Sequence, residues 1–125
     1  MKRVVLVDAD LVSRAATAAI LHTLEFEVET ISTGTRALAR RRKTRPAACL
    51  VAETSQSMTA SEFVHACRHH PRFENVPIVV MSVSPRNSID AIREGAHACI
   101  RKPVDEGSVY AALSDVLAPN RQLPR

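Results

Sequence analysis

The fold is decided by the stretch Val4-Val5-Leu6-Val7-Asp8-Ala9-Asp10. Four consecutive apolar residues that end in an acid are typical of a strand buried on both faces of a parallel sheet. Asp10 then stands where a helix N-cap is expected, in front of an alanine-rich segment at residues 11–24. The stretch therefore predicts a strand, a polar turn and a helix, which is the repeating unit of an α/β fold.

The same unit recurs along the rest of the chain. Further strands are expected at residues 25–31, 47–52, 77–82 and 97–101, and further helices at residues 32–43, 59–70, 84–95 and 105–118. Five such units with short connections predict an open parallel sheet that helices cover on both faces. Ligands of such sheets bind beyond the carboxyl ends of the strands, so the residues to examine are Asp8, Ala52, Ser82 and Lys102.

Length and composition limit the class of protein. A chain of 125 residues is expected to form one domain, and no stretch approaches the roughly 20 apolar residues that span a bilayer. The start of the sequence leaves no room for a signal peptide before the first strand. Cys49, Cys67 and Cys99 are odd in number and widely spaced, which favours reduced thiols over a disulfide framework. We therefore expect a cytoplasmic protein.

The net charge of +4 has a local source between Arg36 and Arg45. The cationic residues of this run are Arg36, Arg40, Arg41, Arg42, Lys43 and Arg45. Such a run can bind nucleic acid, but it more often forms the solvated face and C-terminal end of a helix. No aromatic stacking platform or helix-turn-helix pattern accompanies it, so nucleic acid is an alternative partner and not the expected one.

The ordered residues at the strand ends resemble the receiver domains of response regulators in two-component signalling, over almost the whole chain. In that family the first strand ends in an acid pair, the third in the aspartate that accepts phosphate, the fourth in Ser or Thr and the fifth in Lys-Pro. The corresponding residues here are Asp8-Ala9, Ala52, Ser82 and Lys102-Pro103. The resemblance implies a flavodoxin-like (βα)5 sheet with strand order 2-1-3-4-5. It also implies a receiver-like domain over residues 1–119, followed by a tail or linker at residues 120–125.

Two alanines depart from the family's pattern. Ala9 replaces a carboxylate that the family uses to bind Mg²⁺, and Mg²⁺ prefers an octahedral set of oxygen ligands. Ala52 replaces the acceptor, and a methyl group cannot replace the carboxylate nucleophile of an acyl phosphate. We therefore expect a pseudo-receiver with no cofactor, no metal and no enzyme activity, in which Asp8, Ser82 and Lys102 form a residual polar pocket.

Several alternatives stay open. Glu53 or Asp10 could replace the missing acids, or Thr54, Ser55 or Ser57 could take phosphate from a serine/threonine kinase. Alternatively, the two alanines were engineered into an ordinary receiver to silence it. A zinc site at His65 and His69, which are spaced as i and i+4, is less expected than a surface helix.

The resemblance also implies where a partner binds. Receivers commonly use the face made by the fourth helix, the fifth strand and the fifth helix, and an aromatic on that strand works with the Ser or Thr of the fourth strand as a switch. Here the equivalents of that switch are Ser82 and Cys99, so the aromatic is missing. We expect a constitutive contact there, with a protein partner or a second copy. The residues expected to contribute to it are Asp90, Arg93, Cys99 and Arg101.

Overall fold

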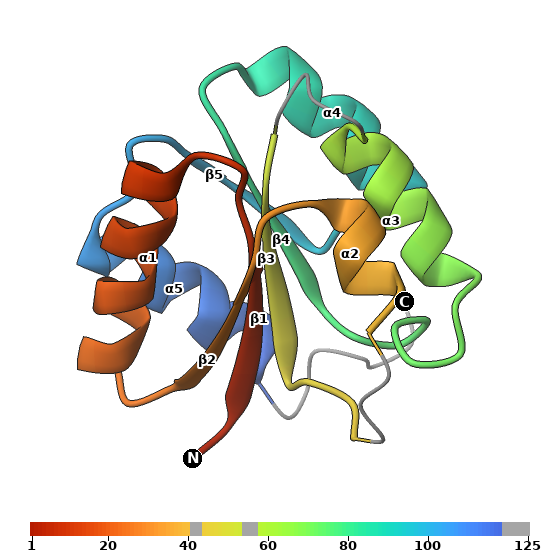
Figure 1. Cartoon of the computed structure of the whole chain (residues 1–125). Coiled ribbons are helices and arrows are strands. Elements are labelled where there is room, and N and C mark those ends of the chain that lie inside the picture. Colours follow the sequence, from red (N-terminus) through yellow and green to blue (C-terminus); the bar gives the residue numbers. More distant parts are fainter. Residues whose placement is uncertain (41–43, 54–57, 119–125) are drawn as a thin grey trace.

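The computed structural model describes residues 1–40, 44–53 and 58–118. A five-stranded parallel sheet runs through it in the order β2-β1-β3-β4-β5 (Figure 1). The strands are β1 (Arg3–Val7), β2 (Glu27–Ile31), β3 (Ala48–Ala52), β4 (Ile78–Ser82) and β5 (Ala98–Arg101). The helices are α1 (Leu11–Thr23), α2 (Gly34–Leu38), α3 (Ala60–Arg68), α4 (Pro85–Glu94) and α5 (Glu106–Val116). The predicted flavodoxin-like topology is confirmed.

The helices cover the sheet on both faces, with α1 and α5 on one side and α2, α3 and α4 on the other (Figure 1). Successive strand residues point to opposite faces, and this divides the core in two. Val4 and Leu6 belong to the cluster that packs against α1 and α5, whereas Val5 and Val7 belong to the cluster that packs against α2 and α3. The alternation decides which helices each residue at a strand end can meet.

Side-chain caps fix where four of the described helices begin, and at α2 the Thr33 hydroxyl accepts the Arg36 backbone N–H. The Asp10 carboxylate accepts hydrogen bonds from the first amides of α1, as predicted. Thr59 and Glu62 form the predicted capping box at the start of α3, and Asp105 caps α5 together with Ser108. These caps end the polar loops after β1 and β5 within a few residues of the sheet. The site at the strand ends is therefore assembled from short, anchored segments.

Helix α2 is shorter than the sequence predicted, because it ends at Leu38 instead of near Lys43. The Leu38 carbonyl oxygen lies 3.0 Å from His70 Nε2, and the Arg40 carbonyl accepts a hydrogen bond from the Arg72 guanidinium. These two side chains come from the segment after α3 and bind carbonyls that a longer helix would use itself. The end of α2 is thus set by a tertiary contact that no local pattern contains.

The other described boundaries agree with the predictions within two residues. Strand β2 begins at Glu27 instead of residue 25, since Glu25 has a left-handed backbone (φ 68°) that interrupts an extended strand. The predicted tail at residues 120–125 lies outside the described residues, and so do Arg41, Arg42 and Lys43 of the basic run. In the described part of the chain, no helix is long and apolar enough to cross a membrane.

Candidate functional site at the carboxyl ends of the strands

Asp8 and Ala52 lie side by side at the carboxyl ends of the adjacent strands β1 and β3. Leu6 pairs with Leu50 and Val7 with Val51, so continuing this register by one residue places Asp8 beside Ala52. Both residues then point to the α1–α5 face, and each is only 3% exposed. The position that the resemblance assigns to the phosphate acceptor is therefore a buried methyl group next to a buried carboxylate.

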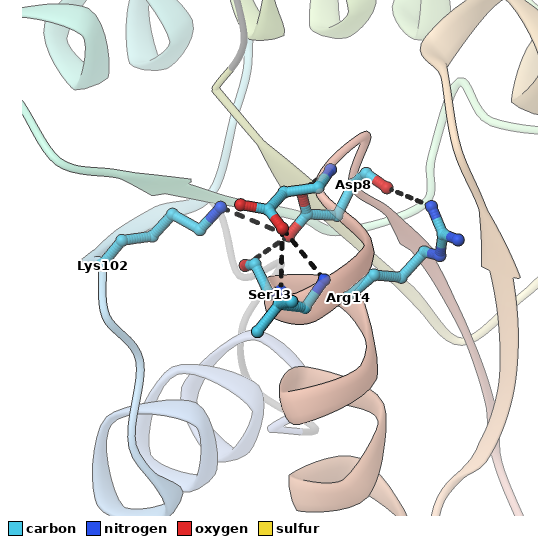
Figure 2. Close-up of polar contacts among 6 residues, drawn as sticks. Asp8, Ser13, Arg14 and Lys102 are labelled. Carbon is cyan, nitrogen blue, oxygen red and sulfur yellow. Dashed lines mark hydrogen bonds and ion pairs between the residues drawn. The ribbon is translucent and has the colours of Figure 1, made fainter.

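The Asp8 carboxylate is held by three donors (Figure 2). Its Oδ1 accepts the Asp10 backbone N–H at 3.0 Å, and its Oδ2 accepts the Ser13 hydroxyl at 2.6 Å. The third donor is the Lys102 ammonium, whose Nζ lies 3.3 Å from Oδ2. The main chain of Asp8 is held as well, since its carbonyl oxygen accepts a bond from Arg14 Nη1 at 2.9 Å.

Lys102 reaches Asp8 from the loop that follows β5. Its backbone N–H donates to the Ser82 carbonyl oxygen at 3.0 Å, which ties the loop to the end of β4, and the Lys102-Pro103 peptide bond is cis. The Lys102 side chain is 16% exposed, so the pair is largely shielded from water. One carboxylate faces one ammonium, and the pocket is close to electrically neutral.

Ser82 does not join this pair, contrary to the contact that the sequence predicted. Its hydroxyl donates to the Ser84 carbonyl oxygen at 2.8 Å and accepts the Ser84 N–H at 3.0 Å. Both bonds turn the hydroxyl back onto its own loop. Ser84 occupies the N-cap position of α4, as predicted, but its side chain makes no capping hydrogen bond.

The residues considered as substitutes for the missing acids lie as follows. Asp10 is engaged in capping α1 through hydrogen bonds from Val12 and Ser13 amides. Glu53 directly follows Ala52, so strand alternation directs it away from Asp8. The candidate phosphate acceptors Thr54, Ser55 and Ser57 lie outside the described residues.

The predicted partner face lies along β5, an edge strand of the sheet (Figure 1). Asp90, Arg93 and Arg101 are exposed and Cys99 is half-buried. A groove of about 240 Å³ runs beside the strand, and it is lined by Ser82, Ser88, Cys99, Ile100 and Arg101. On the adjacent α4, Ile89 and Ile92 are 54% and 46% exposed.

The remaining candidates are two histidines of α3 and the three cysteines. His65 Nδ1 lies 2.9 Å from Glu94 Oε1, which bridges α3 to α4, and the described residues hold no group of three metal-ligating side chains that could bind an ion. The three cysteines are free. Burial raises the pKa of Cys67 to about 12 and raises the pKa of Cys49 as well, which keeps both thiols protonated.

Comparison with known proteins agrees with the layout of these residues. The family model of the response regulator receiver domain matches residues 4–114. The chain belongs to the response regulator receiver domain family. No curated protein matches this receiver domain at a significant level.

Solved receiver structures share its fold. The chemotaxis response regulator CheY4 of Vibrio cholerae is 28% identical, with 94% of this chain and 99% of that chain covered and a TM-score of 0.84. A putative response regulator from Chloroflexus aurantiacus is 20% identical, with 94% and 98% covered and a TM-score of 0.86. The receiver domain of a sensor histidine kinase from Pseudomonas aeruginosa is 17% identical, with 90% and 94% covered and a TM-score of 0.82. That structure has a magnesium ion coordinated in its active-site cleft.

Two residues of this site escaped the sequence reasoning. Ser13 and Arg14 lie three and four residues after the N-cap Asp10, in the first turn of α1, and their side chains reach back to Asp8. Side chains in a helix lean toward its N-terminus, so this spacing was a usable signal.

Proposed function

We propose that this receiver domain signals by protein contact, and that it neither accepts a phosphoryl group nor holds Mg²⁺. The observation that carries the proposal is the buried methyl of Ala52 beside Asp8. An acyl phosphate requires a carboxylate nucleophile at that position. The Asp8 carboxylate itself is shielded, because it already accepts bonds from Ser13, Lys102 and Asp10.

The residues present do not fit a magnesium ion. Mg²⁺ requires near-octahedral oxygen coordination and is usually bound through one or two carboxylates with waters. Here Ala9 and Ala52 offer no oxygen side chain, and the charge of Asp8 is balanced by Lys102. The contrast is with the Pseudomonas aeruginosa receiver domain, whose cleft coordinates magnesium.

The missing aromatic on β5 supports a partner face that is held in one state. Cys99 is too small to fill the space beside α4, and a groove remains where its Sγ lies 3.6 Å from the Ser88 carbonyl oxygen. Ser82, the other half of the family's switch, is bonded within its own loop. Neither residue is set up to move in response to a phosphoryl group. We therefore assign the domain to a constitutive contact along α4, β5 and α5, as a cytoplasmic signalling module and not an enzyme.

Magnesium titration of the native domain and the variant Ala9→Asp/Ala52→Asp tests this proposal. The variant places two carboxylates beside Asp8. Its backbone amides near residues 8–10 should show saturable NMR chemical-shift changes at millimolar MgCl2. The native domain should show none, and neither should Ala39→Asp, which adds an acid at an exposed position. Saturable shifts of the native amides around Asp8 would contradict the proposal.

A further inference from the structure

A second concave site lies at the other end of the sheet's carboxyl edge, beside the edge strand β2. Its volume is about 300 Å³, and it is lined by Arg14, Thr30, Ile31, Ser32, Arg36 and Arg40. The three arginines come from the first turn of α1, from α2 and from the segment just after α2. Segments from different parts of the sequence thus bring three arginines to one pocket, which we call the arginine site (Arg14, Arg36 and Arg40).

Two of these arginines are already held in place. Arg14 Nη1 donates to the Asp8 carbonyl oxygen at 2.9 Å, as Figure 2 shows, and the guanidinium makes no other bond among the described residues. Arg40 forms an ion pair with Glu29, and Glu29 is in turn bound by Arg3 at 2.8 Å. Both guanidinium groups are therefore ordered before any ligand arrives, which lowers the entropic cost of binding.

The third arginine is free to bind. Arg36 is exposed, and within residues 1–40, 44–53 and 58–118 its guanidinium makes no hydrogen bond or ion pair. No carboxylate lines the pocket. Glu29 pairs with Arg40 and Arg3, and Asp8 pairs with Lys102. Among the described residues, no carboxylate therefore pairs with Arg14 or Arg36, and the arginine site keeps a net positive charge.

We propose that the arginine site binds a small phosphorylated ligand. A guanidinium group binds two oxygens of a phosphate in a bidentate arrangement. A phosphate has more oxygens and more negative charge than a carboxylate, so it suits a pocket lined by three arginines better. The hydroxyls of Thr30 and Ser32 add donors of the kind that contact phosphate oxygens. The volume is at the lower limit for ligand pockets, about 300–1,000 Å³, so the ligand is a phosphate or diphosphate group on a small molecule.

The position of the site is that of ligands in open α/β sheets, beyond the carboxyl ends of the strands. It is nevertheless separate from the pocket around Lys102, because Asp8 presents its carboxylate to that pocket and only its carbonyl oxygen to Arg14. Binding of a phosphorylated ligand to the arginine site needs no metal and no phosphoryl transfer. It would give a domain without an acceptor aspartate another way to respond to a small molecule.

Calorimetric titration with pyrophosphate tests the inference on the native domain and three variants. Native protein should bind one pyrophosphate per chain. Arg36→Gln should weaken binding by about tenfold or more, the effect of losing one charge-assisted bidentate contact. Arg36→Lys, which keeps the charge and loses the fork, should fall between the two. Arg86→Gln, an exposed arginine on α4, should bind as the native protein does.

Three results would overturn the inference. One is the absence of saturable pyrophosphate binding to the native domain, and another is equal weakening by Arg36→Gln and Arg86→Gln. The third is tight binding of a short DNA duplex that Arg36→Gln and Arg86→Gln weaken equally and that pyrophosphate does not displace. That result would indicate a general polyanion-binding surface. Thermal unfolding of each variant confirms that the fold is intact, as expected for exposed side chains.

Discussion

At the scale of single residues, the site depends on how a buried carboxylate is satisfied. Asp8 is 3% exposed, and an unpaired charge at that depth would be costly. Two neutral donors, the Asp10 N–H and the Ser13 hydroxyl, and the Lys102 ammonium compensate for the lost water. Since each of Ala9 and Ala52 removes a negative charge from this edge, the remaining pair is balanced without a cation. Under the proposed function, this pair is a structural contact and no longer part of a metal and phosphate pocket.

Removal of Lys102 should therefore destabilise the fold. In Lys102→Ala the Asp8 carboxylate stays buried without its ammonium partner, and we expect a loss of about 1–3 kcal/mol in the free energy of unfolding. Urea unfolding measures it, with Lys2→Ala as the control at an exposed lysine. An unchanged midpoint for Lys102→Ala would show that the pair contributes little.

The sequence predicted the partners of Asp8 only in part. The Asp8–Lys102 pair follows from two strand ends that meet at one edge of the sheet, and it is present. The predicted contact of Ser82 with this pair was wrong, because its hydroxyl bonds to the backbone of Ser84. The strand pattern carries no information about the loop that contains Ser84. The spacing of Arg14 after Asp10 indicates that its side chain reaches back toward Asp8, but the sequence does not say that it binds the Asp8 carbonyl oxygen.

At the scale of elements, caps position the segments that carry the site. Asp105 begins α5 directly after the loop that holds Lys102, and its Oδ1 accepts the Ser108 backbone N–H at 2.7 Å. The pKa of Asp105 is lowered below its ordinary value of 3.8. The hydrogen bond from the Ser108 backbone is the largest cause, and the hydrogen bond with the Ser108 side chain is the second. The folded state thus favours the charged form of this carboxyl group.

The sign of the resulting pH dependence follows. A carboxyl pKa that is lower in the folded state contributes stability above the ordinary value of 3.8, and this contribution is lost as the pH falls through the lower folded value. Asp105→Asn and Asp105→Ser keep a capping oxygen that does not titrate. The gap in free energy of unfolding between native protein and either variant should shrink on acidification, as measured by urea unfolding at several pH values. A gap that stays constant would contradict this assignment.

Helix beginnings were easier to predict than helix ends. Asp10, Thr59 and Asp105 are local signals, and each caps the helix that the sequence assigned to it. The end of α2 was missed by five residues, since it depends on His70 and Arg72 from another part of the chain. Local capping residues therefore specify where α1, α3 and α5 begin, and tertiary contacts specify where α2 ends.

At the scale of the whole molecule, the sheet has two edges, and we propose a different role for each. The β2 edge carries the arginine site, and the β5 edge carries the proposed partner face with exposed Ile89 and Ile92 on α4. The topology and the family followed from the order of motifs along the chain. The arginine site and the groove beside β5 could not be predicted from the sequence, because the exposure of side chains and the shape of grooves depend on how the elements pack.

Charge reversal distinguishes the two edges. Arg93→Glu/Arg101→Glu should weaken self-association of the domain and leave its fold intact, because both side chains are exposed on the proposed partner face. Sedimentation velocity measures the association, with Arg36→Glu/Arg40→Glu as the matched pair on the opposite edge. Association that survives the first pair of changes and is lost with the second would place the interface at the basic run. A native domain that is monomeric would leave a different protein as the occupant of the face.

We propose that this domain lacks the phosphorylation chemistry of its family. The most direct test is intact-mass spectrometry after incubation with acetyl phosphate and MgCl2, with Ala9→Asp/Ala52→Asp run in parallel. The native domain should keep its mass, whereas the variant, which restores a carboxylate nucleophile opposite Lys102, should gain one phosphoryl group. A stoichiometric, base-labile phosphoryl adduct on the native chain would contradict the claim.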